Sequence, residues 1–222
     1  MNNHIENKDT ILWGTSISPY VRKVMVALAE KDIPYKQHEI LPTILLNATG
    51  QAVPEEFERS SPLGKIPAIQ VGDYSLSDSA VIARYLESKF TTGNSLYPKA
   101  PEAYAESLWF EHYSDTTLTD VCYKQIFLEG VVKPKILGVE PDTTLINNAI
   151  KNELPPLLKF LNESLSGKKF FSGDSFSMAD VAITTQLLAL EMYGVTISNE
   201  YPNLKGHFKR IISRPSFVSI LP

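Results

Sequence analysis

The chain has 222 residues, enough for one large domain or two small ones, and 43% of them are hydrophobic, as in ordinary soluble globular proteins. Its 21 Lys and Arg and 25 Asp and Glu give a formal net charge of −4, evenly spread. Because no basic block or stripe is present, we expect no nucleic-acid partner. The longest uncharged run, residues 40–54, is interrupted by polar residues and is shorter than the roughly 20 apolar residues of a membrane span, so no membrane partner is expected.

The N-terminus, MNNHIENKDT, has no apolar core of the kind that directs export. Cys122 is the only cysteine, which excludes an internal disulfide, a CxxC redox centre and a cysteine-based zinc site. The four histidines are scattered without metal-ligand spacing. We therefore expect a cytoplasmic protein that uses no metal.

The first ninety residues alternate strand and helix signals. Residues 10–14 and 35–40 are the first two strand candidates, and Ser18 with Pro19 favours a helix start, because Ser caps helices and Pro suits the first helical position. Apolar residues recur at three- and four-residue spacing over residues 19–31, which indicates an amphipathic helix. Residues 41–56, punctuated by Pro and Gly, are expected to form a loop.

Two further strands, residues 66–71 and 74–76, flank a Gly-Asp turn and precede a helix over residues 79–90. The order β-α-β then β-β-α predicts a small mixed sheet with helices on its faces. The rest is expected to be helical: residues 102–128, 142–165, 177–192 and 203–213, with a kink or a break at Pro155 and Pro156 in the second of these helices. The predicted fold class is thus α/β plus all-α, with an N-terminal domain over residues 1–90, a linker over 91–101 and an all-helical domain over 102–222.

Three motifs resemble the cytosolic glutathione S-transferase family, in particular its serine-type bacterial, theta-, phi- and tau-like classes. They are LWGTSISPYVRKV (residues 12–24), SPLGKIPA followed by LSDSAVIARYL (residues 61–68 and 76–86), and FSMADVA (residues 176–182). They cover both predicted domains. The resemblance implies a thioredoxin-like, glutathione-binding first domain, and it implies that the FSMADVA segment is a capping motif with a structural role, since Ser177 and Asp180 suit a capping box.

The resemblance assigns the catalytic role to Ser18, whose hydroxyl would contact the sulfur of glutathione. A free thiol has a pKa of about 8.5, and lowering it by about two units corresponds to roughly 2.7 kcal/mol. A hydroxyl hydrogen bond near a helix N-terminus suits that task. Ser18 could instead serve only as a helix cap, although one hydroxyl can both donate and accept. Ser16 is the alternative contact for the thiol.

The resemblance also supplies the glutathione-binding residues. A cis proline at Pro67 would turn the backbone of Ile66 toward the cysteinyl part of the peptide, as in an added strand. Asp78 suits the ammonium and Ser79, at a helix N-terminus, suits the carboxylate of the γ-glutamyl end. Capping alone would also explain Asp78 and Ser79.

One departure from the family pattern concerns the glycyl carboxylate of glutathione. Plant-like serine-type members carry a basic residue in the loop before the proline segment, whereas residues 47–53 contain no Lys, Arg or His. Lys65, which adjoins the site, is the first substitute. Lys36 and His38 are the alternatives.

The hydrophobic substrate is harder to place. The resemblance suggests Tyr20, Trp109 and Tyr113 for its pocket, since the last two are four residues apart and share a helix face. An aromatic stripe at helical spacing belongs more often to a core than to a pocket, so core packing is the alternative for Trp109 and Tyr113. Cys122 is expected to be a small buried hydrophobe.

The resemblance implies a detoxifying glutathione transferase: glutathione is the co-substrate, its thiolate attacks a small hydrophobic electrophile, and the protein is a homodimer. Glutathione-dependent isomerisation or peroxide reduction is an alternative outcome in the same fold. A non-catalytic regulatory or protein-binding role is the alternative from a different class. Retention on immobilised glutathione and turnover of an aromatic halide distinguish these hypotheses.

Overall fold

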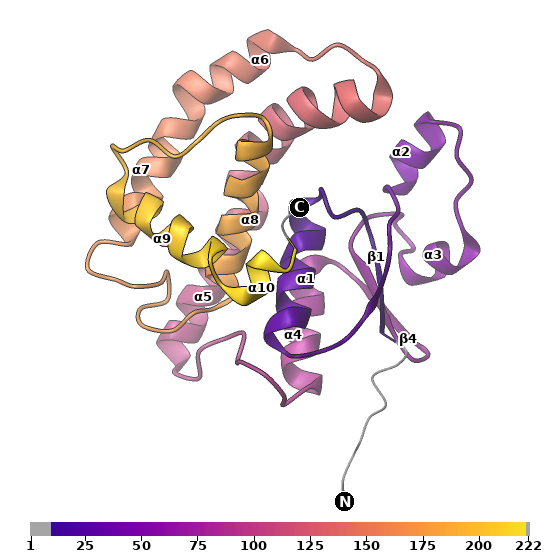
Figure 1. The fold of residues 1–222 in the computed structure, drawn as a ribbon, viewed down its shortest axis with the longest axis horizontal. Helices are drawn as coiled ribbons and strands as arrows, with labels where there is room; N and C mark the ends of the chain where they lie inside the picture. The colour runs from indigo at the N-terminus through magenta and orange to yellow at the C-terminus, as the bar shows by residue number, and fades with distance from the viewer. Residues whose placement is uncertain (1–9, 221–222) are drawn as a thin grey trace, which may run out of the picture. The chain divides into compact units, whose positions relative to one another are not determined.

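The computed structural model describes residues 10–220, and the chain divides into two compact units with the boundary between Leu96 and Tyr97. That boundary falls inside residues 91–101, where the sequence predicts a linker. Figure 1 shows the elements of each unit: a small sheet with helices in the first, and helices throughout the second. Each unit is described separately below.

The first unit is built on a four-stranded sheet with the order β2-β1-β3-β4. Strand β1 (Thr10–Trp13) pairs parallel with β2 (Lys36–His38), and the connecting helix α1 (Pro19–Glu30) completes the β-α-β unit. Strand β3 (Ala68–Val71) is antiparallel to β1 and to β4 (Tyr74–Ser77). Helix α4 (Ser79–Lys89) follows β4 and packs against α1. The predicted thioredoxin-like order is confirmed.

The expectation of a loop over residues 41–56 is wrong. That region contains α2 (Thr43–Ala48) and the start of α3 (Glu55–Ser60). Pro42 and Pro54, which indicate a loop when treated as breakers, instead occupy the N-cap positions of these short helices. Burial of Leu46 in α2 and Phe57 in α3 anchors each helix to the unit.

The second unit is all-helical, as predicted. Its elements are α5 (Pro101–Tyr113), the π-helical segment η2 (Ser114–Leu137), α6 (Thr143–Asn148), the short π-helical η3 (Ala149–Glu153), α7 (Leu154–Ser164), α8 (Met178–Met192), α9 (Pro202–Ile212) and α10 (Pro215–Val218). Helix α8 is buried from Met178 to Leu190 and packs against both η2 and α5. Its nearly uncharged sequence therefore forms the centre of the unit.

Two helix boundaries differ from the sequence-based expectation. The helix predicted to end at residue 128 continues to Leu137, where Gly138 adopts a left-handed conformation (φ 63°) that a glycine accepts without strain. Pro155 and Pro156 do not break their helix. They lie in the first turn of α7, where a missing N–H costs little, and Leu154 keeps helical dihedral angles as η3 passes into α7.

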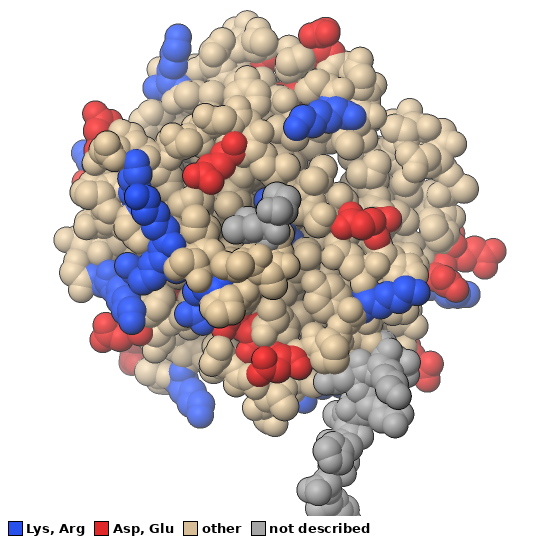
Figure 2. All heavy atoms as spheres, viewed as in Figure 1, with Lys and Arg blue, Asp and Glu red and all other residues tan. Residues whose placement is uncertain are grey.

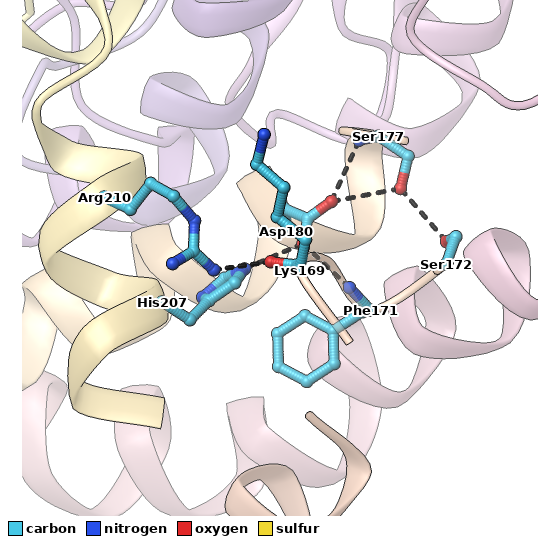
Figure 3. A network of polar contacts seen from close by, with 7 residues as sticks. All are labelled: Lys169, Phe171, Ser172, Ser177, Asp180, His207 and Arg210. Carbon is cyan, nitrogen blue, oxygen red and sulfur yellow. Dashed lines mark hydrogen bonds and ion pairs between the residues drawn. The ribbon is translucent and has the colours of Figure 1, made fainter. Parts of the chain in front are cut away.

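The predicted capping box at the start of α8 is present and is part of a larger buried network (Figure 3). The backbone N–H of Ser177 donates to Oδ2 of Asp180 at 2.9 Å. The other carboxylate oxygen, Oδ1, accepts from the N–H of Phe171 at 3.0 Å and lies 2.8 Å from Nε2 of His207 on α9. Asp180 thus ties three segments of the second unit together.

Charges of both signs are scattered over the face drawn in Figure 2, in agreement with the even distribution along the sequence. Within residues 10–220, no helix has the length and apolar character needed to cross a membrane. The same residues contain no group of three or more His, Cys, Asp or Glu side chains arranged to hold a metal ion.

Candidate functional site

Four residues form a row across one end of the sheet in the first unit. Trp13, the last residue of β1, pairs with His38 of β2 on one side and with Ala68 of β3 on the other, and Ala68 pairs with Ser77 of β4. The segments that carry the predicted glutathione-binding residues begin or end at this row. The sheet therefore brings residues 14–18, 65–67 and 78–79 to the same end of its strands.

Ser18 is the N-cap of α1. Its backbone is extended (φ −72°, ψ 127°), and its hydroxyl oxygen accepts from the N–H of Val21 at 3.5 Å. Pro19 occupies the first helical position, where its fixed φ suits the helix. Because the cap uses the hydroxyl oxygen as an acceptor, the hydroxyl proton can be donated to a bound group. The capping role and the proposed thiol contact are therefore compatible.

The loop before Ser18 is held by three side chains that sequence reasoning missed. Nε2 of Gln37 donates to the carbonyl oxygen of Gly14 at 2.9 Å. The N–H of Ser16 donates to both carboxylate oxygens of Glu39, at 3.2 and 3.1 Å. Nε of Arg22 donates to the carbonyl oxygen of Ser16 at 2.7 Å. Ser16, the alternative thiol contact, thus has both of its backbone groups engaged by side chains.

A weak sequence signal for this arrangement exists. Gln37 and Glu39 are separated by one residue, so they project to the same side of the chain, opposite His38. Burial, and then the nearby Glu39 carboxylate, raise the pKa of Tyr35. Burial lowers the pKa of Arg22. Nothing in the sequence alone shows that these polar side chains face the loop, because that depends on the register of β1 with β2.

Gly14 allows the loop to approach the proline segment closely. Its φ is +142°, and a Cβ placed there would lie 2.5 Å from Cγ2 of Val21 and 3.2 Å from Cβ of Ile66. A larger residue would therefore collide with α1 and push the loop away from Ile66. This contact places the segment that carries Ser18 beside the segment that carries Ile66.

The Ile66–Pro67 peptide bond is cis, as the family resemblance implies. Pro67 is buried and Ile66 is half-buried against the cluster of Trp13 and Phe57. Lys65 is exposed, and its carbonyl oxygen accepts from the hydroxyl of Ser61 at 2.6 Å. The segment therefore keeps a fixed backbone while the Lys65 side chain extends into solvent.

Asp78 caps α4 through a single oxygen. Its Oδ1 accepts from the N–H groups of Ala80 and Val81 at 3.0 and 3.1 Å, and the residue is exposed. Its φ of +82° lies in the left-handed region, which Asp tolerates better than most residues. Ser79, the first residue of the helix, is buried. Capping by Asp78 is thus observed, and its second carboxylate oxygen takes no part in it.

The three candidates for the glycyl carboxylate have different environments. The ring of His38 lies 4.5 Å from that of Trp13, and its Nε2 is buried without a hydrogen-bond partner among the described residues. Lys36 pairs with Ile11, further along the strand from the row at the site. Lys65 is exposed and adjoins Ile66 directly. Lys36 is exposed as well, so the two lysines differ in their position relative to Ile66 and not in exposure.

The aromatic candidates belong to two different units. Tyr20 is half-buried in the first turn of α1. In the second unit, Trp109 and Tyr113 stack with ring centroids 5.5 Å apart, and both contact the ring of Phe160 on α7. Trp109 is 52% exposed, so the stripe is a partly exposed aromatic cluster. Burial, with a contribution from Cys122, raises the pKa of Tyr113 to about 12.

Comparison with known proteins identifies both units of the chain. A family model for the N-terminal domain of glutathione S-transferases matches residues 12–94, and one for the C-terminal domain matches residues 125–215. The chain is 30% identical to glutathione S-transferase F12 of Arabidopsis thaliana, over 95% of this chain and 96% of that protein. It is 29% identical to glutathione S-transferase GstB of Escherichia coli (strain K12), over 92% and 94% of the two chains.

A solved structure shares the fold. The theta class glutathione S-transferase from the citrus canker pathogen Xanthomonas axonopodis pv. citri, determined with glutathione bound, aligns with a TM-score of 0.80 at 23% identity over 95% of each chain. A thioredoxin-like unit followed by an all-helical unit, with both family models matched in order, defines the class. The chain belongs to the glutathione S-transferase family.

Proposed function

We propose that this protein is a glutathione transferase in which Ser18 stabilises the thiolate of glutathione for attack on a hydrophobic electrophile. The observation that carries the proposal is the capping geometry of Ser18, whose hydroxyl oxygen accepts from the N–H of Val21 and leaves its proton to donate. The names of the relatives support the same activity.

The chemistry follows from the position of Ser18. At pH 7 only a few per cent of a free thiol is ionised, and the thiolate is the nucleophile. A hydroxyl donating to sulfur, at a helix N-terminus with its partial positive charge, favours the ionised form. The thiol proton is released to water when the thiolate forms. The sulfur then bonds to the electrophilic carbon, and either a leaving group departs with its bonding electron pair or, in an addition, the adjacent atom takes a proton from water. Ser18 remains protonated throughout and acts as a hydrogen-bond donor.

The other residues at this end of the sheet would hold the glutathione peptide. The backbone N–H and C=O of Ile66 suit the cysteinyl backbone, in the manner of an added strand. The second carboxylate oxygen of Asp78 suits the γ-glutamyl ammonium, and Ser79 suits its carboxylate. Lys65 takes the glycyl carboxylate in place of the basic residue that residues 47–53 lack. Pro67 fixes the backbone of this segment.

The electrophile and the assembly are the remaining parts of the proposal. In the second unit, Trp109 and Tyr113 are the side chains proposed for the hydrophobic substrate, because aromatic surface binds apolar molecules without demanding specific hydrogen bonds. Tyr20, in the first unit, is a separate candidate from the family resemblance. A homodimer in the cytoplasm, using no metal, is proposed from the family resemblance. The single buried thiol of Cys122 suits a reducing compartment.

Two assays test the proposed function. The purified protein is applied to immobilised glutathione and eluted with free glutathione, and conjugation of glutathione to chlorodinitrobenzene is then followed by absorbance. Retention with turnover is the expected result. Retention without turnover would favour a binding protein, and neither retention nor turnover would favour the regulatory alternative. Isomerase or peroxidase activity in place of conjugation would change the reaction assigned to the same site.

A further inference from the structure

We propose that Glu39 is a positioning residue for Ser18. Its carboxylate accepts a hydrogen bond from the N–H of Ser16 and thereby fixes the loop that presents the Ser18 hydroxyl. This inference rests on the proposed function, because it assigns Glu39 a part in activating the same thiol. Glu39 lies on the chain just after β2, outside the motifs that carry the family resemblance. Its side chain acts through the loop.

The carboxylate of Glu39 contacts the loop through both of its oxygens, and a neighbouring side chain orients that carboxylate. Both carboxylate oxygens of Glu39 accept from the N–H of Ser16, at 3.2 and 3.1 Å. Gln37 donates through Nε2 to Oε1 of Glu39 at 2.9 Å and to the carbonyl oxygen of Gly14 at 2.9 Å. Gln37 therefore orients the carboxylate and binds the start of the same loop. The hydrogen bond from the N–H of Ser16 to Glu39 is charge-assisted, because its acceptor is a carboxylate, and the contact with Gln37 sets the orientation of that carboxylate.

Displacement of Ser16 would be transmitted to Ser18. Nε of Arg22 holds the carbonyl of Ser16, while the backbone N–H of Arg22 donates to the carbonyl of Ser18 at 3.0 Å. The N–H of Ser18 donates to the carbonyl of Thr15 at 3.1 Å. The loop and the first turn of α1 are thus bonded to each other on both sides of Ser16. The position of the Ser18 hydroxyl therefore depends on this loop as well as on its capping contact with the N–H of Val21.

Two effects of Glu39 on a bound thiol have opposite signs, which makes the role measurable. A negative charge near the thiol disfavours the thiolate and raises the thiol pKa. A fixed loop that aims the Ser18 proton at the sulfur favours the thiolate and lowers that pKa. The positioning role requires the second effect to dominate. Removal of the side chain must then raise the thiol pKa, although it also removes a negative charge.

The test measures the pKa of bound glutathione from its thiolate absorbance against pH, together with conjugation of chlorodinitrobenzene, in the full-length protein. The variants are Glu39→Ala, Glu39→Gln, Ser18→Ala and the double variant of Glu39→Ala with Ser18→Ala. Glu39→Gln keeps a carbonyl acceptor for the N–H of Ser16 without the charge. Glu58→Ala, which removes an exposed carboxylate from α3, is the matched control.

We expect Glu39→Ala to raise the thiol pKa by about half a unit or more and to lower the rate at neutral pH about threefold to tenfold, with little change in glutathione affinity. Glu39→Gln should restore most of both losses, and Glu58→Ala should match the wild type. On the Ser18→Ala background, Glu39→Ala should no longer raise the thiol pKa, because the positioning effect runs through Ser18. Only the loss of the negative charge then remains, which leaves the thiol pKa unchanged or lowers it.

An unchanged or lowered thiol pKa in a folded Glu39→Ala protein would overturn the inference, and so would a full additional shift on the Ser18→Ala background. If Glu39→Ala fails to fold, Glu39→Asp decides, because it keeps the negative charge but draws the carboxylate back from the N–H of Ser16 by one methylene. A raised thiol pKa supports the positioning role, and a thiol pKa equal to that of the wild type overturns it. These results differ from a failure of the proposed function, in which the wild-type protein itself shows no bound thiolate and no conjugation.

Discussion

Nε2 of His207 lies 2.8 Å from Oδ1 of Asp180, and both side chains are fully buried in the second unit. The capping box predicted from the sequence implies a cost of about 1 kcal/mol for loss of the cap. The observed network is larger, because the same carboxylate also accepts from the N–H groups of Ser177 and Phe171. Removal of Asp180 would leave three buried polar groups without their partner.

We therefore expect Asp180→Ala to lower the free energy of unfolding by about 3 kcal/mol or more, since each orphaned buried group carries its own desolvation cost. Urea unfolding followed by circular dichroism measures the change. Asp174→Ala, at an exposed position in the preceding loop, is the control and should stay within about 0.5 kcal/mol of the wild type. A loss of only about 1 kcal/mol would mean that the cap alone matters.

Cys122 should be inert in the folded protein. Burial raises the pKa of its thiol to about 12, so the thiolate is absent at pH 8. We expect a disulfide reagent to label the native protein negligibly and the urea-unfolded protein completely. Because the folded pKa exceeds the unfolded value of about 8.5, the stabilisation from the neutral thiol is full below that pH and is lost as the pH rises toward 12. Rapid labelling of the native protein at pH 8 would contradict this.

Glu87 should make the first unit sensitive to acid. Burial alone raises the pKa of Glu87, but hydrogen bonds from Ser95 (2.6 Å), the N–H of Leu96 (3.1 Å) and Lys31 (3.1 Å), with the charge of Lys31, more than offset it and lower that pKa overall. A lowered pKa stabilises the fold above the unfolded value of about 4.3, and this is lost as the pH falls through the folded pKa.

Comparison of Glu87→Gln with the wild type by urea unfolding at several pH values checks this prediction. The wild type should be the more stable at pH 6 to 7, and the difference should disappear as the pH falls below about 4.3. A difference that is independent of pH would show that the carboxylate charge does not contribute.

Asp78→Asn separates the capping role from the ligand role of this residue. The amide keeps an oxygen for the N–H groups of Ala80 and Val81 and tolerates the positive φ, so the melting temperature should change little. Loss of the charge should weaken glutathione binding by about 1.5–3 kcal/mol, the range for a hydrogen bond to a charged group. Calorimetric titration with glutathione is the measurement, and an unchanged affinity would reduce Asp78 to a helix cap.

The sequence predicts the order of the elements in both units because hydrophobic periodicity and capping residues are local signals. The strand-turn-helix around Ser18 and the capping box at Ser177 and Asp180 are examples. Pro42 and Pro54 depart from the expectation of a loop, because a proline can mark either a loop or the start of a short helix. The choice depends on burial of Leu46 and Phe57, which is a tertiary property.

The candidate site is likewise predictable from the sequence only where its signals are local. Ser18, Asp78 and Ser79 lie in motifs and are recognisable one at a time. The contribution of Glu39 depends on the pairing of Trp13 with His38, which aligns the end of β2 with the loop after β1. The partnership of His207 with Asp180 joins residues 27 apart in sequence. Apart from the one-residue separation of Gln37 and Glu39, neither contact leaves a periodic or spacing signal in the chain.

The measurement that tests the account most directly is the titration of the thiol of bound glutathione in the wild type, Ser18→Ala, Ser18→Cys and Ser16→Ala proteins, with the conjugation rate measured alongside. Ser18→Ala should raise the thiol pKa and slow conjugation about ten- to a hundredfold at neutral pH, with a much smaller change in affinity. Ser18→Cys places a thiol at a helix N-terminus, where its pKa falls. When oxidised glutathione is supplied, this thiolate should attack its disulfide, form a mixed disulfide with one half and release the other half as reduced glutathione.

Ser16→Ala should behave nearly like the wild type, because the backbone groups of Ser16 make its observed contacts. A shift of the thiol titration in Ser16→Ala but not in Ser18→Ala would move the catalytic role two residues upstream. If neither substitution shifts the titration, the serine-type mechanism is contradicted for this protein.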